Sequence, residues 1–244
     1  MNLSSIWDFF ASLFCAFLGT CAADHCRVEN WRGVDHTICS FAVAEVTVRT
    51  HWKDADGKIY GHPSRLSDAD GRLLMAMNGG MYHDDLGPVG LYVEEGKQKK
   101  ALSTKGGYGN FHLLPNGVFW VRNGKAGVTE TGAYRKRVAG KMPDFATQSG
   151  PMLVIDGKRH PRFLKNSDSR KIRNGVGVSN DGKRLHIAIS HGTVTFWDFG
   201  DLFKDRLQAH NALFLDGTVS TIRAEGLSRG SWRAVGPLIG VYAK

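Results

Sequence analysis

The chain has 244 residues, a length that fits one large domain or two small ones, and 42% of its residues are hydrophobic. Its 30 glycines fall at turn-like positions, which excludes a collagen-like chain or a flexible linker and indicates many short strands. The net charge of +9 favours anionic partners, but the basic residues are scattered and no zinc-finger or RNA-recognition motif occurs, so we do not expect nucleic acid as a partner.

The N-terminal segment has the composition of a secretory signal. Residues 6–23 are almost wholly apolar, a run shorter than the about 20 residues that a membrane-spanning helix needs. The run ends in small residues before Asp24, although residues 1–5 carry no Lys or Arg. We therefore expect residues 1–23 to be removed, leaving a mature domain of residues 24–244 that is periplasmic or secreted and has no membrane span. Lipidation at Cys21 or a plain N-terminal anchor is the alternative.

Two cysteines lie beyond the segment that is expected to be removed. Cys26 and Cys39 are close in sequence, and such a pair usually forms a disulfide in an oxidising compartment. Closing a loop this short stabilises a protein by about 3 kcal/mol on the chain-entropy estimate. Two free thiols are the alternative. The chain has no CxxC or HExxH motif, so we expect no dedicated transition-metal site.

The first half of the chain is predicted to form strands joined by turns. Residues 40–52 mix Val, Thr and Phe as a strand does, and a turn at 54–57 ends them. Residues 73–77 form a continuous apolar run, which is typical of a strand buried on both faces. Three hairpins are expected next, around turns at 95–97, 115–117 and 123–124, the second with residues 111–114 as its first strand.

The second half is predicted to add three strand regions. Residues 152–155 form a strand that a turn at 156–157 closes. Apolar and polar residues alternate on both sides of the turn at 180–182, which predicts another hairpin. Residues 193–197 are also predicted to be a β-strand, and residues 212–215 form the last buried strand.

The clearest helix follows residue 197. Asp198 is expected to cap it, and apolar residues recur at helical spacing from Phe199 to Leu207. Strands and helices do not alternate regularly, which excludes TIM-barrel and Rossmann folds. We therefore predict an α+β fold, with a large, mostly antiparallel β-sheet core and a few helices in a single domain.

Two predicted strands end in the same way, in a polar residue followed by glycine. Residues 73–77 lead into Asn78-Gly79-Gly80, and residues 213–215 lead into Asp216-Gly217. A buried strand holds its terminal side chain at the edge of a sheet, and glycine lets a ligand approach the backbone closely. Asn-Gly and Asp-Gly are also common turn pairs, so two simple turns are the alternative interpretation.

These two strand ends belong to an ordered set of motifs. Ser149-Gly150-Pro151 and Arg173, which precedes a Gly-Val-Gly strand, lie between them in the chain. The ordered set resembles the phosphodiester glycosidase family, whose members include the lysosomal uncovering enzyme, and in particular its bacterial exported subgroup. The resemblance extends from about Phe41 to Tyr242, and it implies a hydrolase that cleaves glycosyl phosphodiesters, such as those of envelope or extracellular glycans.

The resemblance assigns catalytic roles to Asp216, Arg173 and Asn78. Arg173 suits the binding of phosphate oxygens, and Asp216 suits a base, a nucleophile or a group that stabilises an oxocarbenium-like carbon. Asn78 suits the orientation of sugar hydroxyls or phosphate. Other residues are expected to bind the substrate, which is a sugar phosphate or phosphorylated glycan: Gly79, Gly80, Ser149, Gly150, Gly217, Ser220 and His191.

The sequence departs from the family pattern at one position in the acidic motif. Thr218 stands where the family usually has a second glycine, which narrows the backbone conformations open to that turn. This departure favours an alternative function, a glycan- or phosphate-binding protein without catalysis. No cofactor is expected, and a loosely held divalent cation beside Asp216 is the alternative. Glu225, Asp84 and Asp85 are candidate carboxylate partners. His83, which follows the Asn-Gly-Gly loop, is a candidate functional histidine, with a surface histidine as the alternative.

Overall fold

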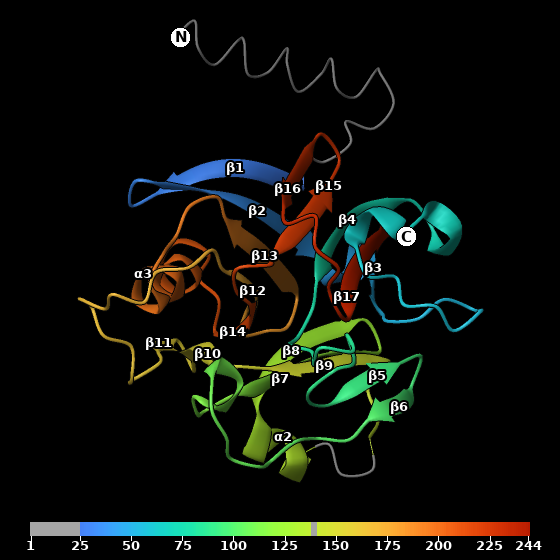
Figure 1. The fold of residues 1–244 in the computed structure, drawn as a ribbon, viewed down its shortest axis with the longest axis horizontal. Helices are drawn as coiled ribbons and strands as arrows, with labels where there is room; N and C mark the ends of the chain where they lie inside the picture. Colours follow the sequence, from blue (N-terminus) through green and yellow to red (C-terminus); the bar gives the residue numbers. More distant parts are fainter. Residues whose placement is uncertain (1–24, 138–140) are drawn as a thin grey trace, which may run out of the picture.

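The computed structural model of the chain describes residues 25–137 and 141–244 (Figure 1). Its strands form three sheets, of seven, five and five strands, in which every paired strand runs antiparallel to its neighbours. The structure confirms the predicted class, a single domain made mostly of antiparallel sheet with few helices. The predicted signal at residues 1–23 lies outside the described residues.

The seven-stranded sheet carries one of the two strand ends singled out above. Its strand order is β1 (Cys26–Trp31), β2 (Val34–Ala42), β13 (Arg184–Ser190), β12 (Asn174–Val178), β14 (Asn211–Asp216), β10 (Met152–Ile155) and β11 (Lys158–Arg159). Cys26 and Cys39 lie opposite each other on β1 and β2 and form the predicted disulfide.

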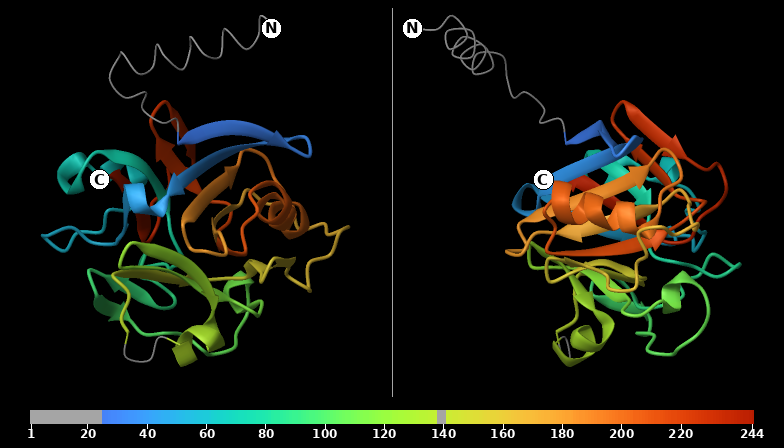
Figure 2. Two further views of the ribbon diagram at one scale, coloured as in Figure 1. Left: turned by 180° about the vertical axis from the view of Figure 1, so that it is seen from behind. Right: turned by 90° about the vertical axis from the view of Figure 1, so that its left-hand side faces the viewer.

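The two five-stranded sheets complete the scaffold. One has the order β16 (Leu227–Gly230), β15 (Thr221–Ala224), β4 (Leu73–Asn78), β17 (Leu238–Ala243) and β3 (Val46–His51). The other has the order β6 (Lys97–Lys100), β5 (Tyr92–Glu94), β9 (Phe145–Ser149), β7 (Gly117–Arg122) and β8 (Lys125–Glu130), and α2 (Thr131–Arg137) follows β8. The two views in Figure 2 show the sheet that contains β5 to β9 at the bottom, packed beneath the other two sheets.

One apolar cluster joins all three sheets. Met75 on β4, Phe119 on β7 and Ile187 on β13 are all buried in it. A second cluster lies between the seven-stranded sheet and its covering helix, where Phe199, Phe203 and Phe214 are fully buried. Burial of apolar surface from all three sheets is the main favourable term in holding them together.

The predicted helix lies on the seven-stranded sheet, but it starts earlier than expected. α3 spans Phe196–Asp201 and continues as a π-helical turn, η5 (Leu202–Arg206). The N-cap is Thr195 rather than Asp198, because the Thr195 hydroxyl accepts a hydrogen bond from the amide of Asp198 at 3.0 Å. The β-strand prediction for residues 193–197 is therefore wrong at its end. No helix in the described residues is long and apolar enough to cross a membrane.

Most predicted hairpins are confirmed, and one is wrong. The turns at 95–97, 123–124 and 180–182 join paired strands. The turn at 156–157, predicted only to end a strand, joins β10 to β11. Residues 111–114 form no strand, because Asn110–His112 is a short 3-10 helix, η4. Asn116 instead uses its buried side chain to bond the carbonyl of Phe111. The predicted strand 40–52 is two strands, β2 and β3, separated by the 3-10 turn η1 (Val43–Glu45).

Candidate active site

Asp216 and Asn78 come together where two sheets meet. Asp216 is the last residue of β14, and Asn78 is the last residue of β4. The Asn78 Nδ2 donates a hydrogen bond to the Asp216 Oδ2 at 3.0 Å. The two apolar strands therefore deliver their terminal polar residues to one point, as strand ends of this kind are suited to do.

The side-chain amide of Asn78 is fixed in one orientation. Its Oδ1 accepts hydrogen bonds from the Asn174 Nδ2 and from the backbone amide of Thr221, both at 2.8 Å. Because two donors occupy the oxygen, the NH2 group must face Asp216. Asn78 is fully buried, so these bonds are made without competition from water.

Asn174 is a site residue that the sequence analysis missed. It lies opposite Asp216 in the β12–β14 register, and its Oδ1 accepts a hydrogen bond from the Asp216 backbone amide at 2.7 Å. Its Nδ2 bonds Asn78, so one buried side chain holds both residues. The only signal in the sequence is its place directly after Arg173, at the start of a predicted strand.

The Asp216 carboxyl is held in a largely desolvated position. Burial raises the pKa of Asp216 to about 6, against the opposing effect of hydrogen bonds from the Gly217 amide, Asn78 and Tyr82. The Gly217 amide lies 2.6 Å from the Asp216 Oδ1. Tyr82, also missed from the sequence, has its own pKa raised by burial and by the neighbouring Asp216 charge. The carboxyl thus changes its charge near neutral pH, as a general acid or base does.

The turn after Asp216 is tight and well bonded. The Ser220 amide donates to the carbonyl of Gly217 at 2.8 Å, and the Ser220 hydroxyl lies 3.2 Å from the carbonyl of Asp216. Thr218 is exposed in this turn and does not have a positive φ angle. The turn therefore forms without the conformational freedom of glycine at position 218.

Arg173 lies beside the site with a buried side chain, which has 1% of its surface exposed. Its Nε and Nη2 donate to the carbonyls of Val194 and Ser169, each at 3.0 Å, while its Nη1 has no partner among the described residues. The guanidinium stacks on Phe196, 3.6 Å from the ring centre. Burial lowers the pKa of Arg173 to about 10.

Arg173 and Asp216 approach each other from neighbouring strands without direct contact in the described chain. The centre of the Phe214 ring lies 5.4 Å from the Arg173 guanidinium. A Cβ atom on Gly217 would lie 3.9 Å from the edge of the same ring. The structure thus joins Asn78 directly to Asp216, whereas the Arg173 cation packs against the rings of Phe196 and Phe214.

The glycines and Ser149 hold the backbone around Asn78 and Asp216 in place. The amide of Gly79 donates to the carbonyl of Pro237 at 2.7 Å, and that of Gly80 to the Thr147 hydroxyl at 3.3 Å. A Cβ on Gly80 would lie 2.4 Å from the carbonyl oxygen of Gln148, so only glycine fits between β4 and β9. The buried hydroxyl of Ser149 donates to the carbonyl of Leu215, at the base of Asp216. Gly150 packs against Asn116 and precedes a cis peptide bond.

The other candidate residues make no hydrogen bond or ion pair with Asp216 in the described part of the chain. His191 follows β13, and its Nε2 is 2.8 Å from the Thr37 hydroxyl, while burial lowers its pKa. Glu225 is exposed and pairs with Arg72. Asp84, Asp85 and His83 are exposed in the loop after Gly80. In residues 25–137 and 141–244 there is no group of three or more His, Cys, Asp or Glu side chains that could hold a metal ion.

The fold of this chain is shared with solved structures of other proteins. The structure resembles the catalytic domain of zebrafish N-acetylglucosamine-1-phosphodiester alpha-N-acetylglucosaminidase, auto-inhibited by its pro-peptide, with a TM-score of 0.59 and 15% identity over 90% of this chain and 82% of that one. It also resembles a hypothetical protein from Synechocystis, with a TM-score of 0.54 and 15% identity over 90% of this chain and 61% of that one. At these identities the likeness establishes a shared fold.

Sequence comparison gives the family. Residues 71–242 match the phosphodiester glycosidase family. The chain is also 36% identical over 231 residues to the uncharacterized protein YigE of Escherichia coli strain K12, which covers 93% of this chain and 87% of that protein. The chain therefore belongs to the phosphodiester glycosidase family, as its ordered motifs suggested.

Proposed function

We propose that the protein is a hydrolase that cleaves glycosyl phosphodiesters, in which a sugar carbon is joined through phosphate to a second group. The observation that carries the proposal is the Asp216 carboxyl, which has a pKa of about 6 and is held by the fixed amide of Asn78. Family membership supports the same reaction. We assign catalytic roles to Asp216, Arg173 and Asn78.

In the proposed reaction, water attacks the anomeric carbon and the bond from that carbon to the phosphate oxygen breaks. Ionised Asp216 takes a proton from the attacking water, and the bonding electrons leave with the phosphate monoester. Phosphate leaves readily, so a second carboxyl group is not required to protonate it. Inversion at the anomeric carbon, followed by NMR, would support this role, whereas retention would make Asp216 a nucleophile instead.

The buried cation of Arg173 suits an anionic substrate. Its Nη1 has no partner among the described residues, and an uncompensated buried charge is costly, so an incoming anion would relieve that cost. Because the guanidinium is covered by Phe196, we expect this ring to shift before Arg173 contacts the phosphate directly. Without that shift, Arg173 would act on the phosphate through its charge alone.

The alternative function is a protein that binds glycans or phosphate without catalysis. The feature that favours it is Thr218 in the acidic motif, and the ordinary φ angle at this position weakens that argument. The two functions are separated by incubating the mature protein with a chromogenic sugar-1-phosphodiester beside Asp216→Ala and Arg173→Ala variants. Turnover that both variants lose supports the hydrolase. Binding without turnover by the parent protein supports the alternative.

We also propose that the reaction takes place in the periplasm or outside the cell, on envelope or extracellular glycans. The Cys26–Cys39 disulfide supports an oxidising compartment. The test is to express the full chain in a bacterium and to measure the mass of the protein recovered from each fraction. An N-terminus near Asp24 in the exported fraction is expected, while an uncleaved cytoplasmic product would contradict the proposal.

A further inference from the structure

The loop of residues 231–237, between β16 and β17, is tied to the candidate site at both ends. At its start, the amide of Ser231 donates to the carbonyl of Ser220, in the turn that follows Asp216, at 3.3 Å. At its end, the carbonyl of Pro237 accepts from Gly79 at 2.7 Å, and Gly236 packs against the Tyr82 side chain. The loop therefore runs along one border of the site.

The middle of the loop is also fixed. The carbonyl of Ser231 lies 3.3 Å from the His62 Nε2, and the amide of Val235 donates to the carbonyl of Gly61 at 2.8 Å. The Val235 side chain is fully buried. The backbone on both sides of Trp232 is thus held in place, so its position relative to Asp216 is set by the fold.

Trp232 projects from this fixed backbone almost entirely into solvent, with 88% of its surface exposed. Tryptophan is among the most buried residue types on average, and leaving this side chain in water contributes nothing to folding. A large, rigid aromatic surface at the border of a site is the kind of group that lines ligand sites. Packing against the core does not account for a tryptophan at this position.

Two exposed arginines lie close to Trp232 in the chain. Arg233 is exposed, and its amide is held by the Ser231 hydroxyl at 3.0 Å. Arg229 on β16 is exposed and donates to the carbonyl of His191 at 3.1 Å, which connects the same border to the end of β13. An aromatic face next to arginines suits a sugar ring that carries an anionic group.

We propose that Trp232 and Arg233 form an outer subsite that binds an acidic saccharide portion of the substrate, extending outward from the phosphodiester. The indole stacks on a sugar ring, and the guanidinium pairs with a carboxylate or phosphate next to that ring. This inference rests on the proposed function, because it places the subsite on the same substrate. It identifies the preferred substrates as acidic oligosaccharide phosphodiesters rather than small ones.

Two diesters of N-acetylglucosamine 1-phosphate test the subsite, one with methanol and one with a disaccharide that contains a uronic acid. Trp232→Ala should raise KM for the disaccharide diester about tenfold more than for the methyl diester, the factor expected for one lost aromatic contact. Trp232→Phe should recover most of the loss. Arg233→Gln should raise KM for the acidic diester and reduce its dependence on salt. Val28→Ala, which truncates an exposed apolar residue on β1, is the control.

Equal effects of Trp232→Ala on the two diesters, or none, would overturn the subsite. If the wild type cleaves neither compound, the hydrolase proposal fails separately, and calorimetry with the same two compounds decides the subsite. Weaker binding of the disaccharide compound by Trp232→Ala would then support it. Equal binding by both proteins, or no binding by the wild type, would overturn it.

Discussion

At the scale of single residues, the charge of Asp216 should set the pH dependence of the reaction. A general base acts only when it is ionised, and burial raises the pKa of Asp216 to about 6. We therefore expect kcat/KM to rise about tenfold per pH unit below pH 6 and to level off above it. A pH profile measured with a sugar-1-phosphodiester checks this expectation.

The control for the profile is an aspartate with no place in the site. Asp156→Asn changes an exposed carboxyl in the β10–β11 turn and should leave the profile unchanged. Asp216→Asn should remove activity at every pH. A wild-type profile that is flat from pH 4 to 8 would show that Asp216 does not act as the base.

The same carboxyl should affect the stability of the fold. The pKa of Asp216 is raised from 3.8 in the unfolded chain to about 6 in the folded protein, so the folded state binds the proton more tightly. The resulting stabilisation is complete below pH 4 and is lost as the pH rises through 6. Between pH 4 and 7, the free energy of unfolding of the wild type should fall relative to that of Asp216→Asn, by an amount on the order of 2 kcal/mol. Urea unfolding of both proteins across this range measures it, and a constant difference would contradict it.

The buried charge of Arg173 allows function to be separated from stability. Arg173→Met removes two hydrogen bonds to backbone carbonyls and also an uncompensated buried cation, and these effects oppose each other. We expect the free energy of unfolding to change by less than about 2 kcal/mol, while activity is lost. Urea unfolding and turnover are measured on the same preparation. Retained activity in a folded Arg173→Met protein would remove Arg173 from the mechanism.

The residues of the site could be predicted from sequence only in part. Asn78 and Asp216 were found because each ends an apolar strand before glycine, a pattern that is local in sequence. Asn174 and Tyr82 were missed, because each acts through a hydrogen bond across the fold and no local pattern distinguishes it. Trp232 was missed because exposure on an ordered loop is a property of the folded chain.

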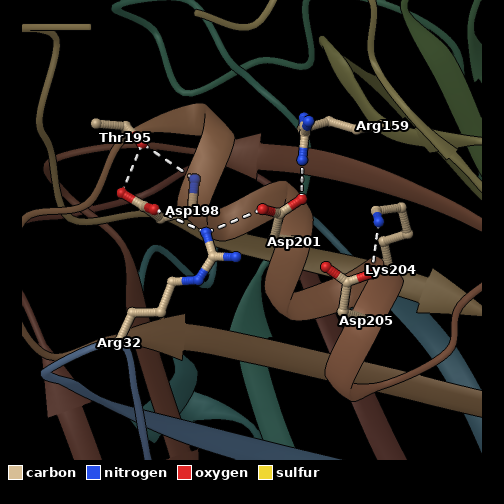
Figure 3. A network of polar contacts seen from close by, with 7 residues as sticks. All are labelled: Arg32, Arg159, Thr195, Asp198, Asp201, Lys204 and Asp205. Carbon is tan, nitrogen blue, oxygen red and sulfur yellow. Dashed lines mark hydrogen bonds and ion pairs between the residues drawn. The ribbon is translucent and has the colours of Figure 1, made fainter. Parts of the chain in front are cut away.

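At the scale of secondary-structure elements, α3 is attached to the sheet by a network of charged residues (Figure 3). Asp201 on α3 is buried, and it pairs with Arg159 on β11 and, at 2.9 Å, with Arg32 at the β1–β2 turn. Asp201→Asn should lower the free energy of unfolding by about 1–3 kcal/mol, because Arg159 loses its carboxylate partner and Arg32 keeps only the more exposed Asp198. Urea unfolding measures the change.

The matched control lies one turn further along the same helix. Asp205 pairs with Lys204 at the surface (Figure 3), and exposed pairs of this kind contribute little to stability. Asp205→Asn should therefore change the free energy of unfolding by less than about 0.5 kcal/mol. Equal effects of the two substitutions would show that burial of Asp201 does not strengthen its pairing.

Elements were predictable where turn chemistry is local. Asn123-Gly124 forms a hairpin as expected, and Asp156-Gly157, which was expected only to end its strand, forms one as well, because residues with positive φ lie at both positions of each turn. Pro115-Asn116-Gly117 contains the same signal but forms no hairpin, because the Asn116 side chain is bonded to Phe111 and to Thr131. Tertiary contacts therefore decide whether an Asn-Gly pair acts as a hairpin turn.

At the scale of the whole molecule, the site depends on pairings between distant segments. β4 pairs with β15 and β17 rather than with a neighbour in sequence, and β14 lies between β12 and β10. Periodicity predicts each strand but not its partner, so the number of sheets and the meeting of Asn78 with Asp216 were not predictable from the strands alone. The ordered motifs indicated that Asn78 and Asp216 converge, but they did not indicate that the strands divide among three sheets.

The Cys26–Cys39 disulfide should stabilise the whole chain through its unfolded state. It closes a loop of sequence separation 13 between β1, which pairs only with β2 in the described residues, and the body of the sheet. Cys26→Ala with Cys39→Ala should therefore lower the free energy of unfolding by about 3 kcal/mol, and alanine avoids placing a hydroxyl group at these buried positions. Urea unfolding with and without reductant measures the effect. Reductant should bring the wild type to the stability of the double variant and leave the variant unchanged, and a wild type that is insensitive to reductant while fully reduced would show that strand pairing alone holds β1.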